Sequence, residues 1–129
     1  MDTAPAAQAW VDGWAKAWPL GDASAVAALY AEDARFFSHS FREHQEPRAY
    51  AEWAFADQST AECRFGTPVV GGDRAAVDWW AVITTRDGVQ ETVAGTSLLR
   101  FAADGLVLDQ RDAWASQEGR HGLPHWATD

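Results

Sequence analysis

Apolar residues recur at helical spacing through the first third of the chain and at every second position through much of the rest. Trp10, Trp14 and Trp18 lie four residues apart, which predicts an apolar stripe along one face of a helix that ends near Gly21. Two more helices and a short strand complete this part, with a polar loop over residues 38–47. The helices are predicted over 23–30 and 48–57, and the strand over 34–38.

Beyond residue 60 the apolar period becomes two, which is typical of strands. Short turns such as Asp87–Gly88 separate these strands, so consecutive strands form an antiparallel meander. The strands are predicted over 62–70, 75–86, 89–102 and 106–116. Three helices followed by a meander indicate an α+β fold in which a curved sheet wraps around the helices. Residues 1–129 form one domain with a core at about 6–118, and the aperiodic tail 119–129 is predicted to be a loose arm.

The strand over residues 75–86 is apolar on both faces but carries a carboxylate, Asp78, in its middle. A buried aspartate is costly unless it is paired, hydrogen-bonded or protonated. Asp78 is therefore a candidate acid or base in an apolar pocket. The alternative is a structural salt bridge to a strand arginine, such as Arg64 or Arg111.

Charge and composition narrow the classes of function. The 129 residues carry a formal net charge of −9, with 10 basic and 19 acidic side chains, which argues against nucleic acid and anionic membrane surfaces as partners. The single cysteine excludes an internal disulfide and fits a reducing compartment. Without a signal-peptide pattern or a long apolar run, we expect a cytoplasmic protein. Eight tryptophans indicate a large apolar cavity or interface.

Two separated segments resemble a known superfamily. The first runs from Gly21–Asp22 through Leu29–Tyr30 to Asp33–Ala34, and the second is Leu99–Arg100–Phe101 followed by Asp104–Gly105. They are similar to the nuclear-transport-factor-2-like superfamily, in its SnoaL-like and ketosteroid-isomerase-like branch. The resemblance implies a cone-shaped barrel with a pocket at its open end. It also implies a homodimer formed through the outer sheet face.

The resemblance also implies which chemistry to expect. Trp14, Ser38 and Ser97 stand where ketosteroid isomerases have a donor tyrosine, a basic aspartate and a second acid, so that mechanism is not expected. Members similar to limonene-epoxide hydrolase use two carboxylates and an arginine. Asp78 and Asp112 match the carboxylates, but the arginine position is not filled. SnoaL-type cyclases imply Asp112 as acid or base with a nearby histidine, for which His39 is the candidate.

The same alignment turns Asp78 and Trp80 toward the pocket and Trp79 toward a partner subunit. On the last strand it turns Trp114, and by alternation Gln110 and Asp112, toward the pocket. The candidate catalytic residues are Asp78, Asp112 and His39. The candidate ligand-binding residues are Trp14, Ser38, Trp80, Ser97, Gln110 and Trp114. We expect no cofactor and no metal site. The sequence thus predicts an enzyme that uses cofactor-free acid/base chemistry (cyclase, isomerase, dehydratase or epoxide hydrolase) on a small hydrophobic metabolite. The alternative is a non-catalytic ligand-binding or dimeric accessory protein.

Overall fold

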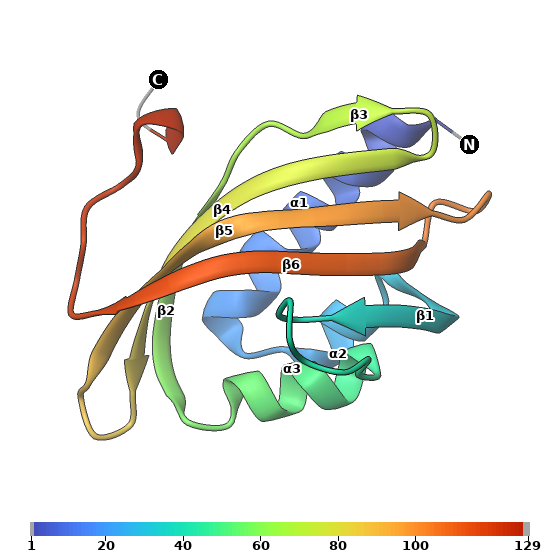
Figure 1. The fold of residues 1–129 in the computed structure, drawn as a ribbon. Coiled ribbons are helices and arrows are strands. Elements are labelled where there is room, and N and C mark those ends of the chain that lie inside the picture. The colour runs from blue at the N-terminus through green and yellow to red at the C-terminus, as the bar shows by residue number, and fades with distance from the viewer. Residues whose placement is uncertain (1, 128–129) are drawn as a thin grey trace.

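Three helices precede and interrupt the strands of one curved sheet in the computed structural model, which describes residues 2–127 (Figure 1). The helices are α1 (Thr3–Leu20), α2 (Ala23–Ala27) and α3 (Pro47–Phe55). The first helix ends where the sequence predicts, because Gly21 adopts the left-handed conformation (φ 64°). Asp2 and Asp22 cap α1 and α2 by accepting backbone N–H bonds.

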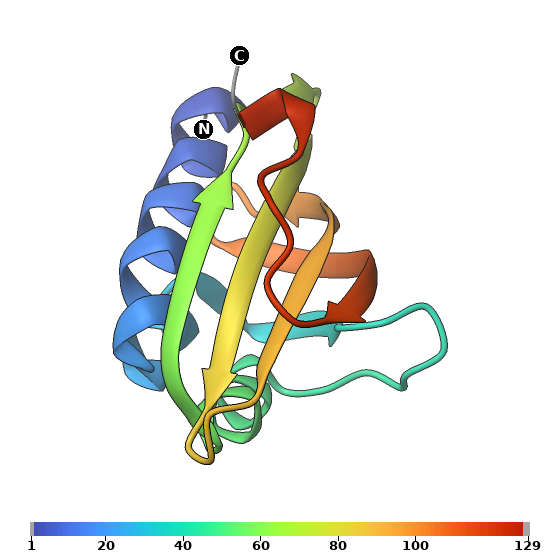
Figure 2. The same cartoon turned by 90° about the vertical axis from the view of Figure 1, so that its left-hand side faces the viewer.

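The sheet is mixed rather than wholly antiparallel. Its strands are β1 (Tyr30–Phe37), β2 (Gln58–Phe65), β3 (Val69–Gly71), β4 (Arg74–Thr85), β5 (Gln90–Phe101) and β6 (Val107–Glu118). The order is β1-β6-β5-β4-β2, with β3 also on β4, and only the β1–β6 pair among these strands is parallel. The sheet curls around α1 (Figures 1 and 2). The predicted α+β cone is therefore confirmed, although β1 begins at Tyr30 because α2 is shorter than predicted.

The tryptophan stripe of α1 packs against the concave face of the sheet and forms the centre of the core. Contacts between indole rings extend from the helix to the sheet, since the ring centroids of Trp18 and Trp79 lie 5.9 Å apart. Within residues 2–127, no helix is long and apolar enough to cross a membrane.

The strand register decides which residues face this core. Ser97 on β5 is paired with Val77 on one side and with Asp112 on the other. Cross-strand partners share a face, and neighbours along a strand face opposite ways. Because Ser97 and Asp112 are buried on the concave side, Val77 and Trp79 lie there too. The predicted inward orientation of Asp78 and Trp80 is wrong, and so is the outward orientation of Trp79.

The segment after β6 packs against the convex face of the sheet, where the sequence predicted a loose arm (Figure 2). The Thr92 hydroxyl donates to the Gly119 carbonyl oxygen (2.7 Å). The Arg120 guanidinium pairs with Glu62 (2.6 Å) and lies 5.9 Å from the ring centroid of Trp80. A single 3-10 turn, η1 (His125–Ala127), follows. Residues 128–129 lie outside the described residues. Trp80 is buried on the outer face of the sheet.

Candidate functional site

A cavity of about 80 Å³ lies between the helices and the concave face of the sheet. Its wall is aromatic on the helix side and carries three polar side chains from β5 and β6: Ser97, Gln110 and Asp112. The remaining lining residues are Trp10, Trp14, Trp18, Tyr50, Ala54, Phe55, Phe65, Trp79 and Ile83. The fold therefore encloses a small polar patch within an apolar chamber, the usual make-up of a ligand site.

Asp112 is the charged group of this patch. Its Oδ1 accepts hydrogen bonds from Ser97 Oγ (2.6 Å) and Gln110 Nε2 (3.0 Å), and Ser97 Oγ in turn accepts one from Trp79 Nε1 (2.9 Å). Among residues 2–127, no basic side chain forms an ion pair with Asp112. Burial raises the pKa of Asp112 from 3.8 to about 6, and the two hydrogen bonds oppose this rise. Near neutral pH this carboxyl can both hold and release a proton.

The orientation of Gln110 follows from its other neighbours. Its Oε1 accepts from Trp10 Nε1 (3.2 Å) and from the Tyr30 hydroxyl. Tyr30 Oη itself accepts from Trp14 Nε1 (3.0 Å). Because an indole N–H only donates, the amide oxygen of Gln110 must face Trp10, and its NH₂ group is left to face Asp112. Trp10, Trp14 and Tyr30 thus orient Gln110, and Gln110 donates one hydrogen bond to the carboxylate of Asp112.

Tyr50, from α3, is the second polar group of interest. Its ring stacks on Phe36 with centroids 4.6 Å apart. Among the described residues, its hydroxyl has no hydrogen-bond partner, although it lines the cavity. Burial raises the pKa of Tyr50, the charge of Asp112 raises it further, and the charge of Arg42 lowers it. The neutral phenol is therefore an available hydrogen-bond donor beside Asp112.

Arg42, Trp53 and Trp114 form a cluster next to Tyr50, which lines the cavity and whose ring centroid lies 6.0 Å from that of Trp53; we call this cluster the mouth. The Arg42 guanidinium carbon lies 5.3 Å from the ring centroid of Trp53 and 5.4 Å from that of Trp114. Arg42 Nη1 also donates to Ser38 Oγ (3.1 Å). The His39 ring packs edge-on against Trp114, with centroids 5.1 Å apart. The mouth therefore joins α3, the loop after β1 and the last strand.

The structure brings most of the predicted site residues together. Four of them line the cavity: Trp14, Ser97, Gln110 and Asp112. Three others belong to the mouth or touch it. Trp114 is part of it and donates to the Ser38 carbonyl oxygen (2.6 Å), the Ser38 hydroxyl donates to Gln45 (2.8 Å), and His39 packs on Trp114.

Asp78 and Trp80 are the two predicted residues that lie elsewhere. The Asp78 carboxylate is exposed on the convex face, where Oδ1 accepts from the Thr96 hydroxyl (2.9 Å). Neither salt-bridge partner considered for it, Arg64 or Arg111, pairs with it in the described part of the chain. Tyr50 had no predicted role in the site, and Trp79 was predicted to lie at an interface. The register of β4 against β5 would have found Trp79, but the sequence does not supply that register.

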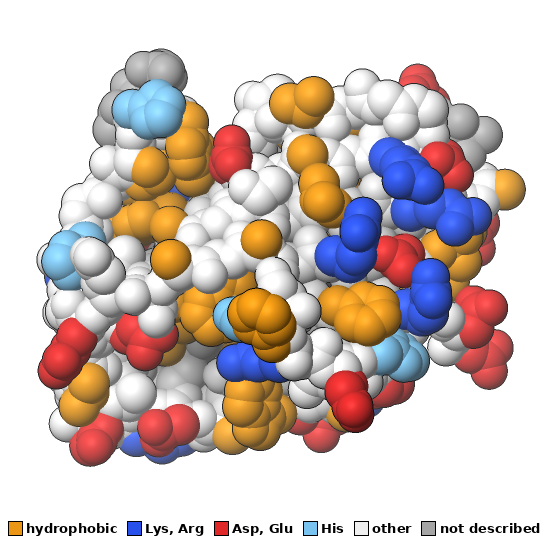
Figure 3. Space-filling view, in the orientation of Figure 1, with side chains coloured by type: hydrophobic (Ala, Val, Ile, Leu, Met, Phe, Trp, Pro, Cys, Tyr) orange, Lys and Arg blue, Asp and Glu red, His pale blue; other side chains and the backbone are white. Residues whose placement is uncertain are grey.

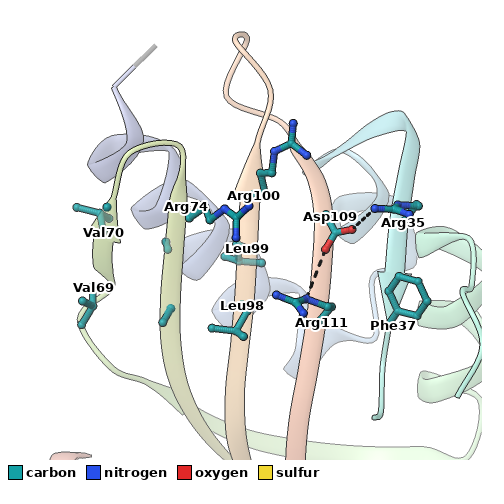
Figure 4. A pocket seen from close by; sticks show the side chains of 13 residues that line it. Arg35, Phe37, Val69, Val70, Arg74, Leu98, Leu99, Arg100, Asp109 and Arg111 are labelled. Atoms are coloured by element: carbon teal, nitrogen blue, oxygen red, sulfur yellow. Dashed lines mark ion pairs between the residues drawn. The ribbon is translucent and has the colours of Figure 1, made fainter. Parts of the chain in front are cut away.

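A larger hollow lies on the opposite side of the sheet (Figures 3 and 4). It measures about 660 Å³ and combines apolar side chains with four arginines. Asp109 pairs with two of them, Arg35 (3.1 Å) and Arg111 (3.8 Å), as Figure 4 shows. Basic side chains gather at this end of the face in Figure 3. The one carboxylate that lines this hollow, Asp109, is ion-paired, so the hollow offers no free acid/base carboxyl among the described residues. Within residues 2–127 no group of three metal-ligating side chains occurs.

A cone-shaped α+β domain with a chamber inside its curved sheet is the class that this geometry defines. The model of the SnoaL-like domain matches residues 7–110, so the chain belongs to the SnoaL-like family of the nuclear-transport-factor-2-like superfamily. The predicted resemblance is thereby confirmed. The comparison with curated proteins returns no match.

Solved structures of the same fold cover most of the chain. SalBIII, an epoxide hydrolase/cyclase-like enzyme of pyran ring formation in the polyether salinomycin, is 16% identical (TM-score 0.72; 84% of this chain and 89% of that chain). A protein with a ketosteroid-isomerase-like fold from Catenulispora acidiphila, in complex with trimethylamine, is 17% identical (TM-score 0.69; 80% and 82%). An NTF2-like protein of unknown function from Exiguobacterium is also 17% identical (TM-score 0.69; 82% and 98%). At these identities the likeness shows the fold alone.

Proposed function

We propose that this protein is a cofactor-free enzyme that moves a proton on a small hydrophobic molecule, with Asp112 as the acid/base group. One observation carries the proposal. Asp112 is buried in an aromatic chamber without a cationic partner among residues 2–127, and its pKa is raised to about 6. A structural carboxylate is normally neutralised by a cation, whereas a raised pKa suits proton transfer near pH 7.

The second polar group, the Tyr50 hydroxyl, suits a developing negative charge on a substrate oxygen. A phenol that stays protonated donates a hydrogen bond without supplying charge of its own. An acid/base carboxyl and a neutral donor suffice for cyclisation, isomerisation, dehydration or epoxide opening. The description of SalBIII as epoxide hydrolase/cyclase-like supports this range of reactions.

The test compares two aspartates on opposite faces of the sheet. We expect the wild-type protein to accelerate α-proton exchange of 2-tetralone in D₂O, or opening of styrene oxide, both followed by NMR. Asp112→Asn keeps the shape but removes the proton-transfer group, so the rate falls by about 10²-fold or more. Asp78→Asn, on the outer face, keeps the wild-type rate. Equal rates for the wild type and Asp112→Asn contradict the proposal.

A non-catalytic ligand-binding module is the second candidate, and the size of the cavity favours it. About 80 Å³ is small beside ligand pockets of roughly 300–1,000 Å³. This candidate predicts that apolar probes bind in the cavity while neither test reaction is accelerated.

A homodimer through the outer sheet face remains a prediction. Val69 and Leu98 support it, because they are 72% and 45% exposed beside the outer hollow. The molecular mass in solution, measured by light scattering, tests it. A cytoplasmic location likewise remains a prediction from the sequence.

A further inference from the structure

Arg42 is a half-buried cation without a carboxylate partner among residues 2–127. Its contacts within that part of the chain are two indole rings and the Ser38 hydroxyl. Cation–π contacts orient a guanidinium but leave its net charge uncompensated. Other basic side chains of residues 2–127 also lack an ion pair, but Arg42 is the one lysine or arginine among them that is not exposed.

The position of Arg42 relates it to the buried carboxyl. Trp114 follows Asp112 by two residues on β6, so the two side chains share a face and lie about 7 Å apart along the strand. The Arg42 guanidinium lies over the ring of Trp114, so Arg42 is next to the nearest inward-facing neighbour of Asp112 on that side of β6. The charge of Asp112 raises the pKa of Tyr50 and the charge of Arg42 lowers it, so both groups lie within electrostatic range of this phenol.

We propose that the cavity takes an aromatic or other apolar molecule that carries a carboxylate, and that Arg42 selects it by pairing with that carboxylate at the mouth. This inference rests on the proposed function, since it names the substrate class of the same site. The guanidinium offers two parallel N–H donors that match the two oxygens of a carboxylate. The apolar part of the ligand then extends inward to Tyr50 and Asp112.

The surroundings of Arg42 favour an anion over a neutral ligand. Its two indole contacts and the Ser38 hydroxyl leave its positive charge uncompensated, so an anion gains an ion pair there that a neutral ligand cannot form. A bicyclic ligand is larger than the cavity of about 80 Å³, so it must displace part of the mouth to enter. An anion offsets this cost, because the ion pair replaces the contacts of Arg42 with Trp53 and Trp114.

The experiment uses two probes of nearly equal shape, 2-naphthoate and 2-naphthamide, titrated calorimetrically into the wild-type protein. We expect naphthoate to bind at least about tenfold more tightly, the preference that a charge-assisted pair gives over a neutral one. Arg42→Gln removes this preference, and Arg42→Lys keeps part of it because the charge remains. Arg48→Gln is the matched control. Arg48 also lies on the α3 side, but it is exposed and donates to Ser24.

Equal affinity of the wild type for the two probes overturns the inference, and so does an unchanged preference in Arg42→Gln. A merely structural role for Arg42 weakens both probes alike and leaves their ratio intact, which also overturns it. Failure of the proposed function looks different. The preference then depends on Arg42 as expected, while neither test reaction is accelerated and Asp112→Asn changes no rate.

Discussion

Two aspartates on the two faces of one sheet show how far the surroundings of a carboxylate decide its use. Asp112 accepts a hydrogen bond from Ser97, and Asp78 accepts one from Thr96. Ser97 and Thr96 are neighbours on β5, so the same arrangement of carboxylate and cross-strand hydroxyl occurs once on each side. The inner carboxylate is buried among indoles and the outer one lies in water. Burial, not the residue type or its nearest partner, distinguishes them.

The largest effect of a substitution on stability is expected at Gly95, which faces inward between Trp79 and Trp114 on the neighbouring strands. A Cβ at Gly95 would collide with the Ala113 carbonyl oxygen and the Trp114 backbone, neither of which is free to move away. We expect Gly95→Ala to lower the free energy of unfolding by about 3 kcal/mol or more. Urea denaturation measures it. Thr96→Ala, one residue along on the outer face, costs less than about 1 kcal/mol. Similar losses in the two variants would contradict the difference between the faces.

The second prediction concerns pH and Asp112. Between pH 3.8 and about 6 the folded protein retains a proton that the unfolded chain has released, so the contribution of Asp112 to stability falls as pH rises. Above about pH 6 this contribution of Asp112 to the free energy of unfolding has fallen by its full amount, about 3 kcal/mol at most.

Asp112→Asn lacks this loss. Its stability relative to wild type therefore increases from pH 4 to pH 7, which urea denaturation at a series of pH values measures. Asp78→Asn serves as the control and stays within about 0.5 kcal/mol of wild type at neutral pH. A constant difference between Asp112→Asn and wild type over this range would show that the inner carboxyl titrates like an exposed one.

The third prediction concerns Tyr30, whose hydroxyl joins α1 to Gln110. Tyr30→Phe leaves the buried N–H of Trp14 without its acceptor and costs about 1 to 3 kcal/mol. Arg100→Gln, which removes an exposed ion pair with Asp73 (3.4 Å), costs less than about 1 kcal/mol. Thermal unfolding compares the two. If Arg100→Gln is the more damaging change, the inner network is not what stabilises the fold.

The sequence was sufficient for the helices and for most of the meander, because their periods and turns are local signals. It was not sufficient for the face of β4. Asp78 looked unusual because both sides of its strand are apolar, but Trp80 beside it is buried on the convex face, where the segment after β6 packs. Because of that long-range contact, the outer-face position 80 carries a large apolar residue, as a core position would.

The buried carboxyl was predicted correctly as facing inward, on the family resemblance and on alternation along the last strand. Its hydrogen-bond partners were not predicted as such. Ser97 and Gln110 were predicted only as ligand-binding residues, and Tyr30 had no predicted role in the site. Their convergence on Asp112 depends on strand register and on the approach of α1, which span most of the chain. The mouth was predicted only in part, since Trp114 was a ligand-binding candidate but Arg42, Trp53 and Trp114 come from three different elements.

The row of indoles from helix to sheet has an optical consequence. Neighbouring ring centroids lie 6.3 Å apart for Trp10 and Trp14, 5.9 Å for Trp14 and Trp18, and 5.9 Å for Trp18 and Trp79. Rings this close share their excited states, so near-ultraviolet circular dichroism reports on the whole row rather than on single residues. A molecule that shifts only Trp79 in the chamber changes the signal of all four. The near-ultraviolet circular dichroism of the protein therefore reports whether the chamber is empty or filled.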